Sequence, residues 1–364
     1  MYFAVLGKHP QLSLAEFAVI TPTIVKQRWQ IVFFESTLTS DELRSHLERL
    51  GGVTKRGECI SPVDDEDPQI AEFLTWVQLV GAPTIELGMR FKKTYGVKRF
   101  KLVDQQSSDL EVKQEGKEII QLGSDLWLVN WRQNIQRFEV IDMEKPVRGM
   151  QIGMMPAKLT QIMLNIWVAR AKKWKLSGAD EKLTDTTTDS SLTIYDPFAG
   201  FGTTGLVANS LGHHFIGSDI NITPAKQNQK WRFETSYADS TKHFTLFKQD
   251  VLQPFTHPLL KQVDVIVTEW RLGPVIKKST RLPELHDHAE KIIALYEQFF
   301  SHIREACPGV PIVVTIPNYP RLQDTIPTHI KKAAEQAGFD VTYIDTYSRK
   351  GQEVSREVWV LSHP

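Results

Sequence analysis

Cysteine is scarce in this sequence of 364 residues, with only Cys59 and Cys307, which lie far apart in the chain. Two cysteines cannot build a disulfide framework or a cysteine-based metal site, so a reducing cytoplasm is the expected location. Net charge is lacking too, because 43 basic residues balance 43 acidic ones. This balance excludes a uniformly basic body that binds nucleic acid everywhere, so any such binding must depend on local patches.

Long apolar runs are also missing, and no stretch reaches the ~18 uncharged residues that a membrane-spanning helix needs. The first residues, Met1–Pro10, have no basic start, so we expect a first strand and no signal peptide. Hydrophobic residues at 41% and charged residues at 24% are typical of a folded globular protein. Internal repeats are absent, and the histidines lack partners at metal-ligand spacing, so no metal is expected.

Residues 1–150 predict a small α+β region, in which short apolar runs favour strands and two patterned segments favour helices. Ser40 is the expected N-cap of the second helix, and Gly51 and Gly52 are its expected stop. The acidic segment Asp64–Asp67 is a candidate internal boundary. The expected strands are Tyr2–Leu6, Ile31–Phe34, Ile119–Leu122 and Leu126–Val129, and the expected helices are Leu14–Ile20 and Asp41–Leu50.

Residues 193–364 alternate between strand-like and helical segments, which predicts an α/β fold with a doubly wound sheet. A turn around Arg349–Gly351 predicts a closing hairpin with one antiparallel strand. Before this region, Pro156–Lys175 has helical spacing and Ser177–Ser191 is expected to be a polar loop. The expected strands are Thr193–Tyr195, His214–Ser218, Phe244–Phe247, Val263–Thr268, Ile312–Ile316, Val341–Ile344 and Val358–Leu361, with helices at Glu290–Ile303 and Thr328–Ala337.

The segment with the most chemical information follows the first of these strands and reads Asp196-Pro-Phe-Ala-Gly-Phe-Gly-Thr-Thr-Gly205. Gly200 and Gly202 let the backbone approach a ligand, and the helix that follows offers free N–H groups. The glycines match the G-x-G-x-x-G dinucleotide pattern, while a carboxylate at Asp196 suits a ligand with a cationic amino acid part. The alternative is a simple turn between a strand and a helix.

Two further acids follow the next strands. Asp219 is placed to accept hydrogen bonds from both hydroxyls of a ribose, which fits NAD and S-adenosylmethionine equally. Asp250 is placed to accept from an adenine amino group, with a turn residue as the alternative. Acids at three successive strand ends favour a nucleoside ligand.

Asp196–Thr203 resembles motif I of the class I S-adenosylmethionine-dependent amino-methyltransferases. The chain as a whole resembles the THUMP-domain tRNA guanosine N2-methyltransferases of the guanosine-10 type. The Asp-Pro-Phe and Met-Pro-x-Lys-Leu pieces are the specific ones. The segments that carry the resemblance, beside motif I, are Met1–Gly7, Leu12–Glu16, Leu50–Lys55, Arg148, Gly153–Leu159, Ile162–Asn165, Tyr347–Gln352 and Arg356–Glu357.

The resemblance implies a ferredoxin-like domain at 1–65, a THUMP RNA-binding domain at 66–149, a linker helix and loop at 150–192, and a seven-stranded Rossmann-like methyltransferase domain at 193–364. It implies S-adenosyl-L-methionine as the cofactor and tRNA as the partner, with the target guanine flipped into the site. Whether a small activating protein subunit is needed stays open. The implied cofactor-binding residues are Pro156, Lys158, Asp196, Pro197, Ala199, Gly200, Gly202, Thr203, Asp219, Ile220, Asp250 and Val251.

The sequence departs from this family after the fourth strand, where the family carries Asp-Pro-Pro-Tyr and this chain carries Glu269-Trp270-Arg271-Leu272. We expect these four to be the catalytic residues, with Glu269 accepting from the target amine. Trp270 either stacks on the base or is buried against the sheet, and Arg271 either meets a phosphate or neutralises Glu269. Two alternatives remain open: a tRNA-binding relative with impaired catalysis, and an amino-methyltransferase that acts on DNA.

RNA contact requires clustered cations, and one run of basic residues contains no acid and is interleaved with the aromatics Phe91, Tyr95 and Phe100. A solvated charged face is the alternative for this run. Further cations at Arg170–Lys175 lie beside the catalytic domain, and those at Lys277–Arg281 are expected in the substrate cleft. The residues of the first run, predicted to bind RNA, are Arg90, Lys92, Lys93, Lys98, Arg99 and Lys101.

Overall fold

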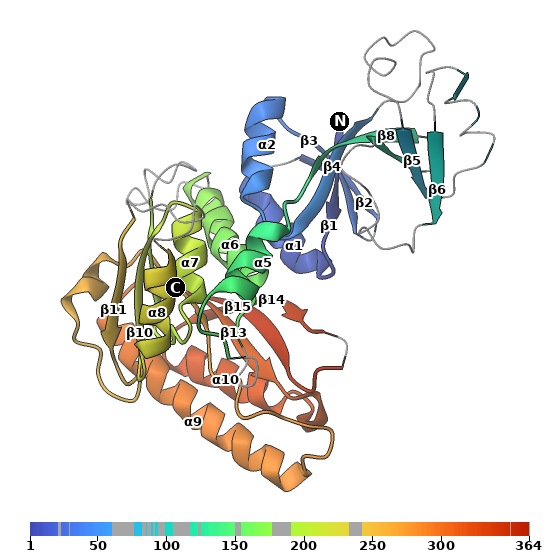
Figure 1. Cartoon of the computed structure of the whole chain (residues 1–364). Coiled ribbons are helices and arrows are strands. Elements are labelled where there is room, and N and C mark those ends of the chain that lie inside the picture. Colours follow the sequence, from blue (N-terminus) through green and yellow to red (C-terminus); the bar gives the residue numbers. More distant parts are fainter. Residues whose placement is uncertain are drawn as a thin grey trace. The chain divides into compact units, whose positions relative to one another are not determined.

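The computed structural model consists of two compact units (Figure 1). The first unit comprises residues 1–10, 20–48 and 53–133, and the second comprises 11–19, 49–52 and 134–364. The predicted boundary at 64–67 and residues 177–190 of the predicted polar loop lie outside the described residues. The structure describes residues 1–20, 23–28, 30–59, 76–81, 85, 89, 92–93, 99–104, 117–122, 125–149, 154–176, 191–232, 242–349 and 351–363.

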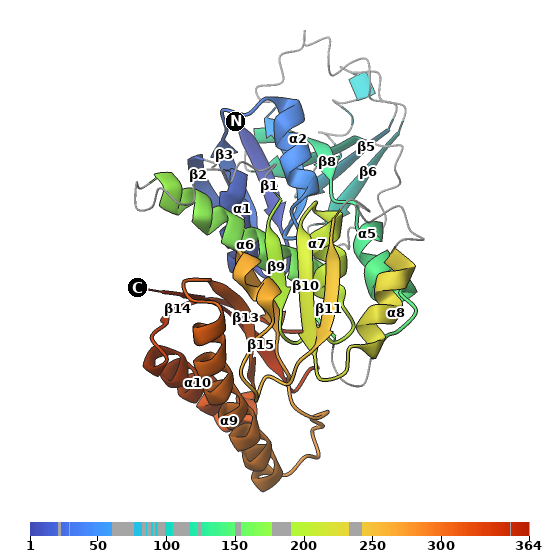
Figure 2. The same cartoon turned by 90° about the vertical axis from the view of Figure 1, so that its left-hand side faces the viewer.

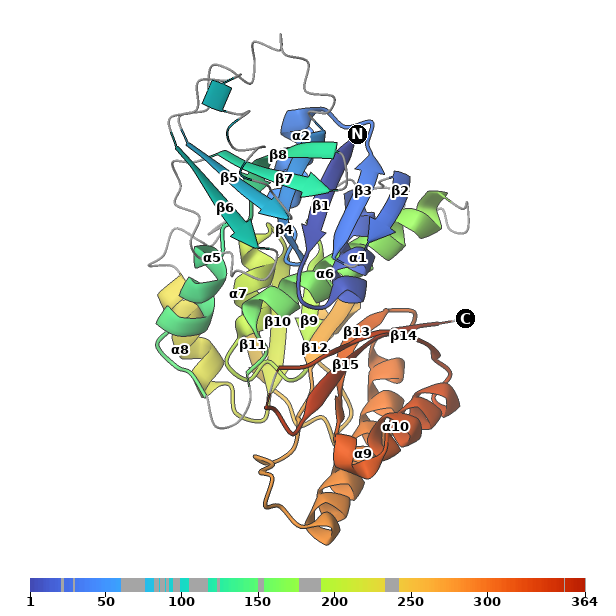
Figure 3. The ribbon, with the colours of Figure 1, turned by 90° about the vertical axis from the view of Figure 1, so that its right-hand side faces the viewer.

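The first unit is built on an eight-stranded sheet with the order β2-β3-β1-β4-β8-β7-β5-β6 (Figure 3). β5 pairs in parallel with β6 and β7, and all other neighbours are antiparallel. All four strands predicted in this region are confirmed, while β2, β4, β5 and β6 were not expected. The strands are β1 (Tyr2–Leu6), β2 (Thr23–Arg28), β3 (Ile31–Glu35), β4 (Val53–Cys59), β5 (Trp76–Gly81), β6 (Arg99–Asp104), β7 (Lys117–Leu122) and β8 (Asp125–Arg132).

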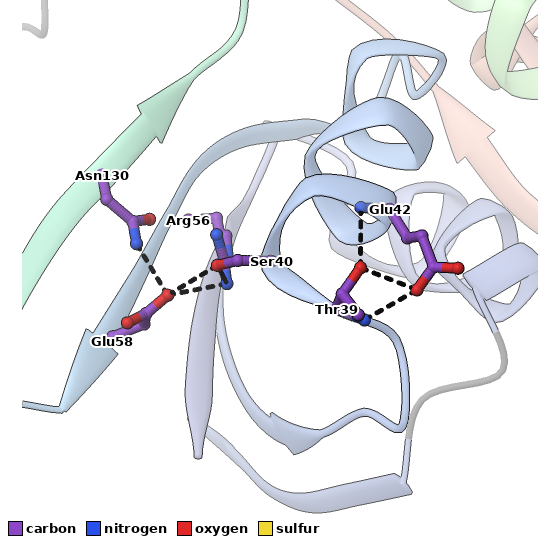
Figure 4. A network of polar contacts seen from close by, with 6 residues as sticks. All are labelled: Thr39, Ser40, Glu42, Arg56, Glu58 and Asn130. Carbon is purple, nitrogen blue, oxygen red and sulfur yellow. Dashed lines mark hydrogen bonds and ion pairs between the residues drawn. The ribbon is translucent and has the colours of Figure 1, made fainter.

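Helix α2 (Ser40–Glu48) shows how the sequence sets a helix start in this unit (Figure 4). Thr39 is the N-cap: its hydroxyl accepts from the Glu42 N–H at 3.3 Å, and its own N–H donates to the Glu42 carboxylate at 2.8 Å. This reciprocal pair is a capping box. The prediction of Ser40 as the cap was therefore wrong by one residue, and the Ser40 hydroxyl instead donates to Glu58.

The predicted stop Gly51-Gly52 has a different role, because both glycines belong to the second unit and lie close to helix α1 (Pro10–Phe17) or α6 (Ala157–Leu176). A Cβ on Gly51 would lie 2.7 Å from the Lys158 carbonyl oxygen, and one on Gly52 would lie 2.7 Å from a backbone atom of α1. Their N–H groups donate to the buried carboxylate of Glu16 at 2.6 and 2.5 Å. Burial raises the pKa of Glu16, and these hydrogen bonds oppose the rise. The helix predicted at 14–20 begins and ends earlier.

The second unit contains a seven-stranded sheet with the order β11-β10-β9-β12-β13-β15-β14 (Figure 2). All neighbours are parallel except β15, which runs antiparallel to β13 and β14. The predicted doubly wound sheet, its strands and the closing hairpin are confirmed. The strands are β9 (Thr193–Asp196), β10 (His214–Asp219), β11 (Phe244–Lys248), β12 (Val265–Glu269), β13 (Ile312–Asn318), β14 (Asp340–Tyr347) and β15 (Ser355–Ser362).

Alternate residues of these strands enter two separate hydrophobic clusters, one on each face of the sheet. In β12, Ile266 belongs to one cluster, and Val265 and Val267 belong to the other. Helices α9 and α10 line the first face, and α6 and α7 line the second. The helices of this unit, beside α1 and α6, are α5 (Gln136–Glu139), α7 (Thr203–Ser210), α8 (Thr223–Arg232), α9 (Leu282–Ala306) and α10 (Thr325–Gln336).

Candidate active site

A cavity of about 510 Å³ lies where the parallel strands of the second unit end. β9, β10 and β12 run in the same direction, so Asp196, Asp219 and Glu269 at their carboxyl ends meet at one edge of the sheet. The volume lies within the range of small-molecule sites. The lining residues are Met154, Met155, Asp196, Pro197, Phe198, Ala199, Gly200, Phe201, Thr203, Thr204, Asp219, Ile220, Asn221, Pro224, Gln249, Asp250, Val251, Leu252, Glu269, Trp270, Arg271, Leu272 and Leu295.

The glycine turn between β9 and α7 forms one wall of this cavity. Gly200 and Gly202 have φ values of +48° and +74°, a region that strains any residue with a side chain. Gly202 is the N-cap of α7 and has no side chain that could occupy the free N–H groups of the first helical turn. These groups and the helix dipole make the end of α7 favourable for a negatively charged or electron-rich part of a ligand.

The Asp196 carboxylate fixes the glycine turn through three hydrogen bonds. Its carboxylate accepts from the Phe198 N–H at 3.0 Å and from the hydroxyls of Thr204 and Thr268, both at 2.6 Å. Burial raises the pKa of Asp196 to about 6, against the effect of these hydrogen bonds. Because three protein donors already occupy the carboxylate, its main observed role is to tie β9, α7 and β12 together.

Asp219 and Asp250 are the more open acids of the cavity. The Asp219 carboxylate accepts from the Gly200 N–H at 3.0 Å and from the Asn221 N–H at 2.9 Å. The Asp250 carboxylate accepts from the Leu252 N–H at 3.0 Å. Each carboxylate has about four acceptor positions, so both retain capacity for a ligand's hydroxyl or amino group.

A buried lysine supports the same wall, and no sequence pattern pointed to it. The Lys145 ammonium donates to the Thr203 hydroxyl at 2.5 Å, and the side chain is fully buried. Burial lowers the pKa of Lys145 to about 8, and nearby Asp142 opposes that change. The neighbouring chain is fixed as well, because the Asn228 side chain donates to the carbonyls of Val147 and Phe201 at 2.9 and 2.8 Å.

The β12 end of the cavity is organised around an ion pair. The Glu269 carboxylate accepts from Arg356 Nε at 2.5 Å, and the two side chains are only 9% and 6% exposed. Burial raises the pKa of Glu269, while the charge and hydrogen bond of Arg356 lower it. Arg356 lies in β15, so the antiparallel hairpin supplies the partner of the catalytic candidate.

Trp270, Arg271 and Leu272 differ in their burial and in their contacts. The Trp270 indole is 1% exposed and packs against Phe198 and Phe299, with ring centroids 4.8 and 4.4 Å apart. This arrangement corresponds to the burial alternative, because both rings cover surface that a base would need. Arg271 is exposed, and the Leu272 carbonyl accepts from the Tyr319 hydroxyl at 2.7 Å.

The cavity includes many residues that the sequence singled out. The four catalytic candidates line it, as do nine of the cofactor candidates: Asp196, Pro197, Ala199, Gly200, Thr203, Asp219, Ile220, Asp250 and Val251. Pro156, Lys158 and Gly202 are not among the lining residues. Met154 and Met155 also line it and belong to the segment Gly153–Leu159 that carries the resemblance, although they were not among the predicted site residues. Further lining residues that were not predicted are Asn221, Pro224, Gln249, Leu252 and Leu295.

The predicted RNA-binding residues belong to the first unit and are only partly described. Lys92 and Lys93 are exposed, and Arg99 and Lys101 lie in β6. Arg90 and Lys98 fall outside the described part of the chain. Among the described residues, no cluster of His, Cys, Asp or Glu is arranged to hold a metal ion, and no helix is long and apolar enough to cross a membrane.

Comparisons with known proteins give one family match. The model of the DNA methylase family of N6 and N4 methyltransferases matches residues 181–230, which include the glycine turn, β10 and most of α8. No curated protein matches the chain significantly.

Several solved structures resemble the chain at low identity. The magnesium protoporphyrin IX methyltransferase from Synechocystis PCC 6803 with bound S-adenosylmethionine is 14% identical, with 63% of this chain and 91% of that chain covered and a TM-score of 0.35. A methyltransferase from Pyrococcus furiosus is 13% identical, with 63% and 95% covered and a TM-score of 0.35. A methyltransferase from Methanosarcina mazei is 11% identical, with 48% and 92% covered and a TM-score of 0.37.

The order of the seven strands, with the single antiparallel β15, is the topology of the class I S-adenosylmethionine-dependent methyltransferases. The glycine turn and the strand-end acids stand where that fold places its cofactor, S-adenosyl-L-methionine. The predicted fold class of the second unit is therefore confirmed: it has the class I methyltransferase fold, whose cofactor is S-adenosyl-L-methionine.

Proposed function

We propose that this protein methylates an exocyclic amine of a nucleic-acid base, using S-adenosylmethionine as the methyl donor. The observation that carries this proposal is the position of the Glu269 carboxylate at the end of β12, in the same cavity as the glycine turn and Asp219. Such a reaction requires a hydrogen-bond acceptor for the target amine next to the site that holds the methyl donor. The family match to N6 and N4 methyltransferases supports an amine as the target.

For the nucleic acid, we propose a guanosine of tRNA, modified at N2. The support is the resemblance to the guanosine-10 enzymes, which spans segments from Met1–Gly7 to Arg356–Glu357. The same resemblance supports the four-part division of the chain and the RNA-binding role of the run from Arg90 to Lys101. A DNA base is the second candidate, and the match of residues 181–230 to a DNA methylase model favours it.

The residues of the cavity fit the cofactor by their chemistry. Asp219 has free acceptor capacity for the ribose hydroxyls, and Asp250 with Val251 suits an adenine ring. The turn at Gly200 and the start of α7 would hold the amino acid part. The bound cofactor supplies an electrophilic methyl group on a positively charged sulfur.

Glu269 has to serve the target amine. An exocyclic amine donates its lone pair into the ring, so an acceptor for its N–H groups helps to turn that lone pair toward the methyl group. As the carbon–nitrogen bond forms, the carbon–sulfur bond of the donor would break and the nitrogen would release one proton to solvent. A carboxylate beside the nitrogen stabilises the positive charge that develops on it. The charge and hydrogen bond of Arg356 favour the carboxylate form of Glu269 and oppose the rise in its pKa that burial causes.

The contacts at the β12 end of the cavity favour an alternative function. In this alternative, the protein is a relative that binds tRNA and S-adenosylmethionine without transferring a methyl group. Arg356 already occupies one oxygen of Glu269, and Trp270 is buried among aromatic rings. In that case the cavity binds the cofactor while the amine finds no free acceptor.

The test is to incubate the purified protein with labelled S-adenosylmethionine and either unmodified bulk tRNA or DNA, and to digest the products to nucleosides. N2-methylguanosine in the tRNA digest supports the full proposal. Label as N6-methyladenine or N4-methylcytosine in DNA would contradict the tRNA assignment. Calorimetric binding of the cofactor with no transfer to either substrate supports the non-catalytic alternative.

A further inference from the structure

The segment that follows Trp270 carries positive charge only. Between Trp270 and Pro283 the sequence contains four cations and no acid. All four side chains are exposed, and so is Arg321, which lies in the short 3-10 helix Pro320–Leu322 and donates to the Lys278 carbonyl. We call residues 271–281 the basic loop, and its cations are Arg271, Lys277, Lys278 and Arg281.

Among the described residues, none of these four cations forms an ion pair with a carboxylate. Elsewhere in that unit, Lys291 pairs with Asp287 at 2.7 Å and Lys331 pairs with Glu335 at 3.8 Å. Unpaired like charges repel one another, so the basic loop leaves an electrostatic cost that a bound polyanion would relieve.

The basic loop is held in place by hydrogen bonds within the loop and from residues 319–322, which follow β13. The Lys277 N–H donates to the Thr280 hydroxyl at 3.0 Å, and the Thr280 N–H donates back to the Lys277 carbonyl at 2.9 Å. Arg321 donates to the Lys278 carbonyl at 3.4 Å. Because Tyr319 also fixes the Leu272 carbonyl, the loop presents its charges on an ordered backbone that begins at the cavity.

Two apolar side chains stand among the charges. Val275 is 61% exposed and Leu282 is 50% exposed. A surface that mixes cations with exposed apolar groups suits a nucleic-acid strand, since phosphates need the charges and sugars or bases can cover the apolar groups. Arg271 lines the cavity, whereas Lys277, Lys278 and Arg281 are not among its lining residues, so a chain of phosphates suits these cations better than a single small anion.

We propose that the basic loop binds the phosphodiester backbone of the substrate strand next to the target base. This inference rests on the proposed function, because it assumes that the base enters the cavity beside Glu269. Arg271 and Leu272 line that cavity, so a strand bound across the loop is delivered to the reacting end of the site. Sequence preference would come from the cavity, and the loop would supply affinity and register.

The test compares two charge-reversed variants of the full chain with equal changes in net charge. The loop variant is Lys277→Glu with Lys278→Glu, and the control is Lys261→Glu with Lys332→Glu. Both control lysines are exposed, and neither lines the cavity. Affinity for unmodified tRNA, for single-stranded DNA and for duplex DNA is measured by filter binding between 50 and about 300 mM KCl, with anionic phosphatidylserine vesicles as a separate probe.

We expect the loop variant to bind its nucleic acid at least about tenfold more weakly than wild type at low salt, with the salt slope reduced by roughly 1.4 to 1.8 for two lost phosphate contacts. The control should stay within about twofold, by the same reasoning on contacts. Equal weakening of both variants, no weakening of the loop variant, no nucleic-acid binding by wild type, or loop-dependent binding to vesicles alone would each overturn the proposal. The tRNA and DNA arms identify which backbone is bound.

Methyl transfer separates this inference from the proposed function. If the wild type transfers methyl groups and the loop variant binds and reacts as well as wild type, the loop proposal fails and the proposed function stands. If the loop variant loses binding while no protein transfers methyl groups, the loop proposal stands and the proposed function fails.

Discussion

The two halves of the cavity rim are built in different ways. At the β9 and β10 ends, the carboxylates of Asp196 and Asp219 accept from backbone N–H groups and hydroxyls, and glycines shape the turn. At the β12 end, the Glu269 carboxylate faces an arginine, and its neighbour Trp270 is buried. The first half is arranged by neutral donors around a ligand space, whereas the second is arranged by a pair of opposite charges.

This difference indicates that the first half of the rim governs cofactor binding and the second half governs methyl transfer. Neutral donors leave the first half able to receive a cofactor with no rearrangement of charge. In the second half, Arg356 already donates to one oxygen of Glu269, so only the remaining acceptor positions of the carboxylate are available to a target amine. Binding of the cofactor and transfer of its methyl group should therefore respond to different substitutions.

Among the substitutions in the cofactor half, Asp219→Ala should cause the largest loss of affinity for the cofactor. The loss of an ionised acceptor for two ribose hydroxyls should weaken cofactor affinity at least about 100-fold. Isothermal titration calorimetry with S-adenosylmethionine measures this change, and Asp340→Ala, at an exposed acid of β14, is the matched control. Unchanged affinity in Asp219→Ala would show that the ribose assignment is wrong.

Replacing Arg356 with methionine should have the largest effect on stability. It leaves the Glu269 carboxylate buried with no partner, which typically costs about 3–5 kcal/mol in the free energy of unfolding. Urea unfolding at pH 7 measures it. Since burial already raises the pKa of Glu269, protonation at pH 5 should recover part of the loss. The double variant with Glu269→Gln should recover more, and a loss that stays the same in it would contradict the ion-pair account.

The buried ammonium of Lys145, which donates to Thr203 at the start of α7, should make the stability of the protein depend on pH. Its pKa is lowered from 10.5 to about 8, so between these values the folded protein binds fewer protons than the unfolded chain. The free energy of unfolding should therefore rise with pH in this window. From pH 7.5 to 9.5, wild type should gain about 2 kcal/mol relative to Lys145→Met in urea unfolding. Parallel pH profiles of the two proteins would contradict burial of the charge.

Trp270→Phe should have the smallest effect and tests whether the indole only packs. Loss of buried ring volume should cost about 1–2 kcal/mol in the free energy of unfolding. The rate of methyl transfer at saturating cofactor should stay within about threefold of wild type, because a packing change alone leaves Glu269 in place. A fall of two orders of magnitude with unchanged cofactor affinity would instead assign the indole to the target base.

The sheet of the second unit was readily predicted from the sequence, and parts of the first unit were not. Strands such as β12 and β13 are buried on both faces, so they begin with the continuous apolar runs Val265–Val267 and Ile312–Val314. In β2, by contrast, Thr23–Gln27 are all exposed, so no apolar pattern marks the strand. The Thr39 cap was missed in favour of Ser40 because both residues can accept from a helix N–H, and only the Glu42 side chain decides between them.

At the site, the sequence predicted the acids at the strand ends, but it offered Arg271 as a possible partner of Glu269, whereas the structure pairs Glu269 with Arg356. Parallel strands bring their carboxyl ends together, so Asp219 and Glu269 were expected at one edge. Arg356 is 87 residues from Glu269 and Lys145 is 58 residues from Thr203, and spacing along the chain cannot show such contacts. The role of Asp196 in holding the turn also depends on two threonine hydroxyls from different elements.

The most direct test of this account is methyl transfer by Glu269→Ala under saturating S-adenosylmethionine, with cofactor affinity measured on the same protein. The account predicts cofactor affinity within about threefold of wild type and transfer reduced at least about 100-fold, because only the β12 half has lost its acceptor. Transfer at the wild-type rate would contradict the role of Glu269. Loss of cofactor binding would contradict the division of the cavity into two independent halves.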